Sequence, residues 1–325
     1  NIARSHYPFR VLFADEVGLG KTIEAGATLK LLWTTGYVRR ILILAPKNVM
    51  RQWWDELRGK FGMPFYLLQS GKPATLIAPD HTELRVTGNP YNEADLIVAS
   101  WHYARGRRGV EPEVLRAQSF DLVVIDEAHA ARITRPSIGS PRPTRLNELA
   151  TALSALTPHL FLVTATPQQL NELEVLDLLR ILGLGGQWVH EDDFRQFYSE
   201  LKAAPAERSQ AGWVHIFRLI AWFAGTYLTG EDVESTIKVA SKGRSLPCYQ
   251  DLEKALKSRS EQAFLDSLRK VPAEDRVVLD KILRSLSPLS WFMIRHNRQM
   301  LENIGYRFPE RILTCLLYTS DAADE

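Results

Sequence analysis

Short apolar runs alternate with amphipathic stretches along the first half of the chain. Each run is apolar at every position rather than at every second one, and the runs cover residues 11–14, 41–45, 96–99, 122–125 and 160–163. Uninterrupted apolar runs are typical of strands that are covered on both faces. With helices between them, they predict an α/β fold built on a doubly wound parallel sheet, whose ligands bind at the carboxyl ends of the strands.

Helices are predicted wherever apolar residues recur every three or four positions. This spacing predicts helices over residues 49–61, 146–153 and 170–182, and Gly183 ends the last of them. Residues 132–145 hold three prolines and a glycine, so this segment is predicted to be a loop.

The second half of the chain is predicted to be mainly helical, from about residue 191 to residue 295, with a loop at residues 240–246. The 325 residues are enough for about two domains. We therefore expect an α/β domain over residues 1–190 and a helical region over residues 191–295. The large apolar residues of this region favour a packed core over a base-stacking surface. They are Trp213, Ile216, Phe217, Ile220, Trp222 and Phe223.

Composition narrows the class of protein. Apolar residues make up 45% of the chain and charged residues 24%, which is typical of a folded soluble protein rather than a disordered one. No apolar stretch approaches the ~18–20 residues of a membrane span, and no secretion signal opens the chain. The two cysteines, Cys248 and Cys315, have no metal-ligand spacing and cannot form a disulfide framework. A reducing, cytoplasmic compartment without a membrane partner is therefore expected.

The formal net charge of +2 says little about partners. Arginines nevertheless cluster at three places along the chain. The clusters contain Arg39 and Arg40; Arg105, Arg107 and Arg108; and Arg132, Arg135, Arg142 and Arg145. For any single cluster, an ordinary solvated surface is the favoured interpretation.

A glycine-rich segment follows the first predicted strand and opens a helix on which Ile23, Ala27 and Leu31 share one face. A strand, a glycine-rich turn and a helix N-terminus bind phosphate through backbone N–H groups and the helix dipole. The segment consists of Asp15, Glu16, Val17, Gly18, Leu19, Gly20, Lys21 and Thr22. Lys21 would neutralise the β- and γ-phosphates of ATP, and the Thr22 hydroxyl would ligate Mg²⁺. Asp15 stands where the strict P-loop pattern has glycine, and alone the segment also fits a chance Lys-Thr pair after a turn.

Two carboxylates, Asp126 and Glu127, follow the apolar run at residues 122–125 and so emerge at the end of a predicted strand. Asp126 is placed to hold Mg²⁺, and Glu127 is placed to orient and deprotonate the attacking water. Alone, the pair also fits an acidic surface turn. The pair lies in the same α/β pattern as the glycine-rich segment. Together the two motifs predict a site for ATP hydrolysis with Lys21, Asp126 and Glu127 as catalytic residues.

Five segments now carry a resemblance to a known family. In order along the chain they read DEVGLGKT at 15–22, LILAP at 42–46, IVAS at 97–100, DEAH at 126–129 and TATP at 164–167. This order resembles motifs I, Ia, Ib, II and III of superfamily 2 helicases. The form of the first motif resembles the SWI/SNF-type branch, above all bacterial RNA polymerase-associated translocases and related phage-defence helicases. The resemblance is strong over residues 1–185, weak through the helical region, and returns near residues 291–314.

The resemblance implies a RecA-like P-loop NTPase lobe and roles for further residues. His129, Thr164, Ala165 and Thr166 would couple the nucleotide state to nucleic acid. Pro46 and Ser100 lie in motifs that touch the phosphate backbone of one strand, although LILAP and IVAS alone also fit buried strands that lead into turns. The implied cofactors are ATP and Mg²⁺. The implied partners are double-stranded DNA and either RNA polymerase or other subunits of a defence system, in a bacterial cytoplasm.

The same resemblance predicts that this chain holds half of a catalytic site. The adenine-reading segment would lie upstream of Asn1, and the second lobe with its arginine fingers would lie beyond Thr314, with residues 296–314 starting the connection to it. Residues 315–325 resemble a translated sequencing adapter, and so are left out of the fold prediction.

Three functions are consistent with these patterns. The leading hypothesis is the ATP-binding lobe of an ATP-dependent translocase on double-stranded DNA, which would be inactive as a fragment. The second is a strand-separating helicase or the motor subunit of a restriction system. The third is a module that binds nucleotide or a partner without turnover.

Overall fold

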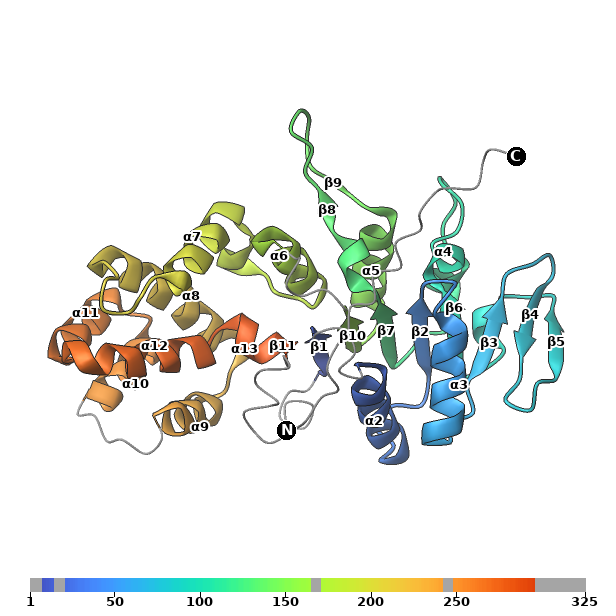
Figure 1. The fold of residues 1–325 in the computed structure, drawn as a ribbon, viewed down its shortest axis with the longest axis horizontal. Helices are drawn as coiled ribbons and strands as arrows, with labels where there is room; N and C mark the ends of the chain where they lie inside the picture. Colours follow the sequence, from blue (N-terminus) through green and yellow to red (C-terminus); the bar gives the residue numbers. More distant parts are fainter. Residues whose placement is uncertain (1–7, 15–20, 165–170, 242–247, 296–325) are drawn as a thin grey trace, which may run out of the picture.

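The computed structural model describes residues 8–14, 21–164, 171–241 and 248–295. Figure 1 shows a central sheet with helices in front of and behind it, and a helical region on one side. The strands are β1 (Arg10–Phe13), β2 (Ile41–Ala45), β3 (Tyr66–Gln69), β4 (Ala74–Ile77), β5 (Glu83–Val86), β6 (Leu96–Ser100), β7 (Leu122–Asp126), β8 (Ile133–Thr134), β9 (Arg142–Pro143), β10 (His159–Val163) and β11 (Met293–Ile294).

The α-helices and the short 3₁₀ helices fill the segments between the strands. The α-helices are α2 (Lys21–Thr34), α3 (Met50–Phe61), α4 (Trp101–Ala104), α5 (Arg145–Leu156), α6 (Glu172–Ile181), α7 (Glu191–Lys202), α8 (Gln210–Tyr227), α9 (Gly230–Ala240), α10 (Cys248–Ser258), α11 (Glu261–Lys270), α12 (Arg276–Ser285) and α13 (Pro288–Phe292). The 3₁₀ helices are η1 (Pro90–Asn92), η2 (Glu113–Arg116), η3 (Ala128–Ala131), η4 (Gly186–Val189) and η5 (Ala273–Asp275).

The main sheet has the strand order β11-β1-β10-β7-β2-β6-β3-β4-β5. Neighbouring strands from β11 to β3 pair in parallel, whereas β4 and β5 are antiparallel to their neighbours. Five of these strands coincide with the five predicted apolar runs, and the predicted α/β fold class with a mostly parallel sheet is confirmed. Parallel order at the centre brings the carboxyl ends of β1, β10 and β7 to the same edge of the sheet.

Alternate residues of each central strand enter two separate apolar cores. Phe13 and Val124 pack with α2 and α3 on one face, whereas Leu12 and Val123 pack with α5 and α6 on the other. Because both faces are covered, every position of β2, β7 and β10 is buried. This two-sided burial is the physical reason for the uninterrupted apolar runs.

The helical region is predicted correctly in its main features. Five of its six named apolar residues are at most 1% exposed, and only Trp222 is partly buried. Its buried side chains belong to the same apolar cluster as those of α5 and α6, so helices α7 to α12 continue the core on that face of the sheet. Most of the loop predicted at residues 240–246 lies outside the described residues; α9 ends at Ala240.

One buried arginine joins three helices of this region. The Arg208 side chain is fully buried and its Nη1 donates to Asp280 Oδ1 on α12 at 2.7 Å. Its Nε donates to the carbonyl oxygen of Glu200 on α7 at 3.0 Å, and its guanidinium lies 4.3 Å from the ring centre of Trp213 on α8. Buried charge is tolerated here because these contacts satisfy the guanidinium.

Three predictions about strands differ from the structure. Residues 132–145 are not wholly a loop, because Ile133 pairs with Pro143 and Thr134 with Arg142 in the β8–β9 hairpin. The β pattern does not stop near residue 170, because β11 returns to the sheet beside β1. The three strands β3 to β5 are additional, and they extend the sheet at its other edge.

The face of α2 that carries Ile23, Ala27 and Leu31 is exposed, with Ile23 at 39% and Leu31 at 41%. The opposite side, with Ala25 and Leu29, is the buried one. A Cβ atom on Gly26 would lie 2.6 Å from Cε2 of Phe61, so α2 packs against α3 through its smallest residues.

Two of the arginine clusters are not simply solvated surface. Arg40 is 9% exposed, and its guanidinium donates to Asp95 Oδ1 at 2.8 Å and to the carbonyl oxygen of Tyr91 at 2.9 Å. Arg135 donates to Asp177 Oδ1 at 2.7 Å, which ties the hairpin to α6. These guanidiniums hold the fold together. Among the described residues, no helix has the length and apolar character needed to cross a membrane.

Candidate active site

The carboxyl ends of three adjacent strands define the candidate site. Phe13 at the end of β1 is level with Val163 of β10, and Val163 is level with Asp126 of β7. The backbone N–H of Thr164 donates to the carbonyl oxygen of Phe13 at 2.9 Å, and Thr164 is fully buried. The carboxyl ends of β1, β10 and β7 therefore lie side by side.

Part of the predicted nucleotide site lies outside the described residues. This applies to Asp15, Glu16, Val17, Gly18, Leu19 and Gly20, and also to Ala165 and Thr166. Lys21 and Thr22 are described, and they form the first turn of α2. This is the helix N-terminus that the sequence predicts for phosphate binding.

Asp126 is 8% exposed, and hydrogen bonds reach both of its carboxylate oxygens. The indole N–H of Trp53 on α3 donates to Oδ2 at 2.8 Å, and the backbone N–H of Glu127 donates to Oδ1 at 2.8 Å. Burial raises the pKa of Asp126, while these two hydrogen bonds and the positive charge of Lys21 lower it. Burial has the largest effect, so the pKa of Asp126 is raised from its ordinary value.

Glu127, His129 and Thr164 form a short polar chain beside Asp126. Glu127 has φ of 51°, in the left-handed region that few non-glycine residues adopt. His129 Nδ1 lies 3.1 Å from Glu127 Oε2 and 3.4 Å from the hydroxyl of Thr164. Uncommon backbone conformations of this kind occur often at functional sites.

Trp53 is the site residue that sequence reasoning missed. Its helical spacing with Leu57 and Phe61 indicates a core residue, and it is indeed 0% exposed. Nothing in the local sequence indicates that its N–H meets a carboxylate 73 positions away. Only the packing of α3 against the sheet produces this contact.

Replacing Trp53 with phenylalanine is expected to lower the free energy of unfolding by about 1–3 kcal/mol beyond the loss in packing, because a buried carboxylate loses a donor. The N–H of Trp53 stabilises the charged form and lowers the pKa of Asp126. This contribution is therefore present above that pKa and lost as the pH falls through it. Urea denaturation over a range of pH should show the difference from wild type shrinking in acid.

Trp54→Phe is the matched control for this prediction. Trp54 is also 0% exposed on α3, but its indole N–H donates to the carbonyl oxygen of Phe65, which does not titrate. Its effect on stability should not change as Asp126 titrates. Equal pH dependence in the two variants would contradict the assignment.

The two predicted nucleic-acid contacts lie at the ends of neighbouring strands. Ser100 ends β6 and is 7% exposed, and its hydroxyl accepts the backbone N–H of His102, which caps α4. The carbonyl oxygen of Pro46 accepts the backbone N–H groups of Val49 and Met50, where α3 begins. Ser100 also lines a hollow of about 570 Å³ together with Lys47, Arg51 and His102. The sequence patterns do not indicate Lys47, Arg51 and His102 as site residues.

Comparison with known proteins gives one family match and several relatives. The model of the SNF2-related domain matches residues 5–227. The RNA polymerase-associated protein RapA of Histophilus somni is 30% identical over 306 residues, which cover 93% of this chain and 28% of that protein. The protein of the same name from Actinobacillus pleuropneumoniae serotype 5b is 33% identical over 195 residues, which cover 59% of this chain and 19% of that protein.

Among solved structures, the Sulfolobus solfataricus SWI2/SNF2 ATPase core in complex with dsDNA matches with a TM-score of 0.43 and 14% identity. This match covers 78% of the present chain and 54% of that one. The chain spans less than a third of the length of both curated relatives named above.

Proposed function

Because the chain belongs to the SNF2-related domain family, we propose that it is the ATP-binding lobe of a motor that couples ATP hydrolysis to movement along double-stranded DNA. The observation that carries the proposal is the meeting of Asp126, Glu127 and His129 at the end of β7. Thr164, the residue that follows the paired strand β10, joins them. Such convergence at the carboxyl ends of parallel strands is where α/β proteins bind ligands.

Lys21 and Thr22 would hold the nucleotide at the start of α2. The N–H groups of the first turn and the Lys21 ammonium favour the negative phosphates. The Thr22 hydroxyl and the Asp126 carboxylate are hard oxygen donors of the kind that Mg²⁺ prefers. Mg²⁺ usually keeps several waters and binds through one or two carboxylates together with phosphate oxygens. Bound Mg²⁺ would neutralise charge on the phosphates.

Glu127 would orient the attacking water and accept its proton. Its carboxylate is held by His129, whose ring nitrogen also faces the Thr164 hydroxyl. A change of charge at Glu127 can therefore reach β10 through two contacts, which supports a coupling role for His129 and Thr164. Thr166 and Ala165 are proposed to extend this path, and Pro46 and Ser100 to contact the phosphate backbone.

The choice of partners rests on resemblance and on the names of relatives. Both curated relatives reported above are named RNA polymerase-associated proteins, so we propose RNA polymerase as a protein partner of the longer protein. Co-purification with RNA polymerase would test this. A defence-system complex is the alternative, and failure to recover the polymerase would favour it.

Hydrolysis is expected to need a second lobe. Residues 1–314 alone should show negligible ATP turnover, because the site at α2 and β7 would lack the arginine fingers that close it. A longer protein that includes the downstream lobe should hydrolyse ATP and be stimulated by duplex DNA. A steady-state ATPase assay of both proteins tests this, and brisk turnover by residues 1–314 would show that one lobe suffices.

The kind of DNA that stimulates ATP hydrolysis distinguishes the proposed translocase from the alternative functions. A translocase should respond to blunt duplex DNA, whereas a strand-separating helicase should need a single-stranded end. A restriction-system motor should depend on the other subunits of its complex. A module without turnover should bind ATP at Lys21 and remain silent with every DNA, even with both lobes present.

A further inference from the structure

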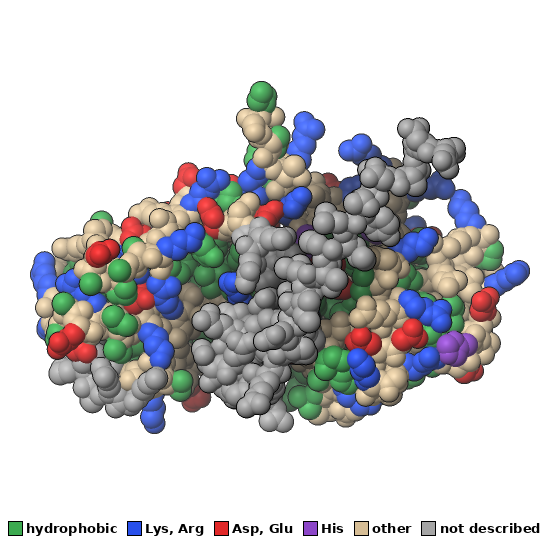
Figure 2. Space-filling model, viewed as in Figure 1, with side chains coloured by type: hydrophobic (Ala, Val, Ile, Leu, Met, Phe, Trp, Pro, Cys, Tyr) green, Lys and Arg blue, Asp and Glu red, His purple; other side chains and the backbone are tan. Residues whose placement is uncertain are grey.

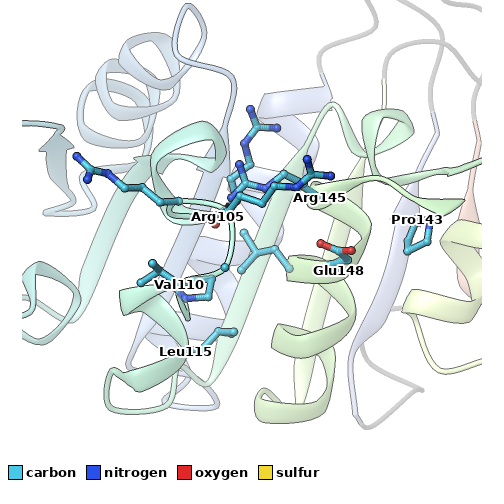
Figure 3. A pocket seen from close by; sticks show the side chains of 11 residues that line it. Arg105, Val110, Leu115, Pro143, Arg145 and Glu148 are labelled. Carbon is cyan, nitrogen blue, oxygen red and sulfur yellow. Dashed lines mark hydrogen bonds between the residues drawn. The ribbon is translucent and has the colours of Figure 1, made fainter.

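Four arginines surround one pocket at the carboxyl edge of the sheet. The pocket has a volume of about 320 Å³. Arg105, Arg107 and Arg108 come from the segment after α4, and Arg145 is the first residue of α5. Figure 3 shows Arg105 and Arg145 close together, above Val110 and Leu115. We call this site the arginine pocket.

The positive charge of the arginine pocket is only partly balanced, because among the described residues that line it four are arginines and only Glu148 is a carboxylate. In the part of the chain that the structure describes, none of the four guanidiniums forms an ion pair with a carboxylate. Arg145 Nη2 instead donates to the carbonyl oxygens of Arg105 at 2.9 Å and Gly106 at 2.8 Å. Burial and the nearby charge of Arg145 both lower the pKa of Arg105. Four positive charges held together beside a single carboxylate favour an anionic ligand.

The arginine pocket is continuous with the surface that holds Ser100. His102 and Tyr103 line both the hollow at Ser100 and a neighbouring one of about 520 Å³. Arg107 and Val110 line both that second hollow and the arginine pocket. Figure 2 shows Lys and Arg side chains gathered along this upper edge, on the side of α4. The basic residues along the three hollows are Lys47, Arg51, Lys72, Arg105, Arg107, Arg108, Arg116 and Arg145.

We propose that the arginine pocket binds a backbone phosphate of double-stranded DNA, and that the three connected hollows form one phosphate-binding track. The inference rests on the proposed function and extends it beyond Pro46 and Ser100. Guanidinium groups suit this ligand because their planar fork donates two parallel hydrogen bonds to phosphate oxygens. Contacts of this kind position the duplex without reading its sequence.

Arg107 and Arg108 provide the sharpest test. Both are exposed, so their replacement by glutamine should leave the fold intact. Each lost phosphate contact should reduce the slope of log Kobs against log salt concentration by about 0.9. For Arg107→Gln/Arg108→Gln we expect a slope smaller by about 2 and roughly tenfold weaker binding, equally for unrelated duplex sequences. Fluorescence anisotropy with labelled duplexes at several salt concentrations measures both quantities.

Two further variants serve as controls. Arg39→Gln/Arg85→Gln removes the same charge from exposed positions before β2 and on the edge strand β5, away from the track, so it should leave the slope unchanged. Glu148→Gln removes the carboxylate that lines the arginine pocket, and this change should tighten DNA binding about two- to threefold. If the residues of the arginine pocket only stabilised the fold, removing arginines and removing Glu148 would not change DNA affinity in opposite directions.

The outcomes separate this inference from the proposed function. If wild type binds duplex DNA and the Arg107/Arg108 double variant keeps its affinity and slope, the inference is wrong and the motor proposal stands. If wild type shows no salt-dependent binding to duplex DNA, the proposed function fails as well. Inorganic phosphate and tripolyphosphate form the second arm. If either binds the pocket tightly while duplex DNA does not compete, the site takes a small anion and the DNA assignment is overturned.

Discussion

ATP hydrolysis by the Glu127→Gln variant is expected to be about 10²–10⁴-fold slower than by wild type, when both lobes and saturating duplex DNA are present. Glutamine has the same shape and can adopt the same backbone conformation, so the left-handed φ of 51° is not at issue. It cannot accept the proton of the attacking water. Nucleotide binding should therefore persist while kcat falls, as measured by steady-state ATPase rates and by binding of a fluorescent ATP analogue.

Lys21→Ala should also abolish turnover, but by a different route. Without the ammonium at the start of α2, the phosphates lose a charge partner, so nucleotide binding should weaken together with hydrolysis. Glu83→Gln is the control, because Glu83 is an exposed carboxylate on the edge strand β5. Wild-type rates in the Glu127→Gln protein would rule out the proposed mechanism.

Replacing Arg208 with methionine is expected to lower the free energy of unfolding by about 3–5 kcal/mol. The change leaves Asp280, which is 6% exposed, with one partner fewer in a low-dielectric core. It also leaves the carbonyl oxygens of Glu200 and Ala203 without their donor. Urea denaturation followed by tryptophan fluorescence measures the loss, and a loss below about 1 kcal/mol would contradict the prediction.

A double replacement distinguishes the loss of the attraction between Arg208 and Asp280 from the cost of leaving the Asp280 carboxylate buried without Arg208. In Arg208→Met/Asp280→Leu no unpaired carboxylate remains, and Arg284, which also contacts Asp280, is exposed enough to be hydrated. Buried ion pairs replaced as a whole by apolar residues often cost little. The double variant should therefore recover a large part of the stability that the single variant loses.

The central sheet could be predicted because its strands are buried on both faces. The run Leu122 to Ile125 has no polar residue, and neither has the run Ile41 to Ala45. The edge strands were not predicted, because β5 has three exposed residues of four and β11 is only two residues long. Such short or exposed strands form because their backbone groups pair with a neighbouring strand. The identity of that neighbour cannot be read from the local sequence.

The sequence singles out the charged residues of the candidate site, but it does not reveal the residues that contact and stabilise them. Asp126 and Glu127 could be singled out because they follow a fully apolar run in the same α/β pattern as the glycine-rich segment at residues 15–22. Trp53 could not, since an indole on a helix face is indistinguishable from ordinary core. The same holds for Arg40, whose partners Asp95 and Tyr91 are more than fifty residues away. Whether a polar or charged residue stabilises the fold or lies free on the surface depends on contacts between elements that are far apart in the sequence.

The pairing of β11 with β1 joins residues about 280 positions apart in the sequence. During synthesis the amino-terminal strands emerge first, so one side of β1 keeps its backbone groups unpaired until Met293 and Ile294 have been made. Open strand edges are templates for pairing with other chains. Pairing of β11 with β1 is expected to form slowly, because the paired residues are so far apart in the sequence. A chain truncated before Met293 is therefore expected to aggregate through β1, even though every other strand of the sheet is present.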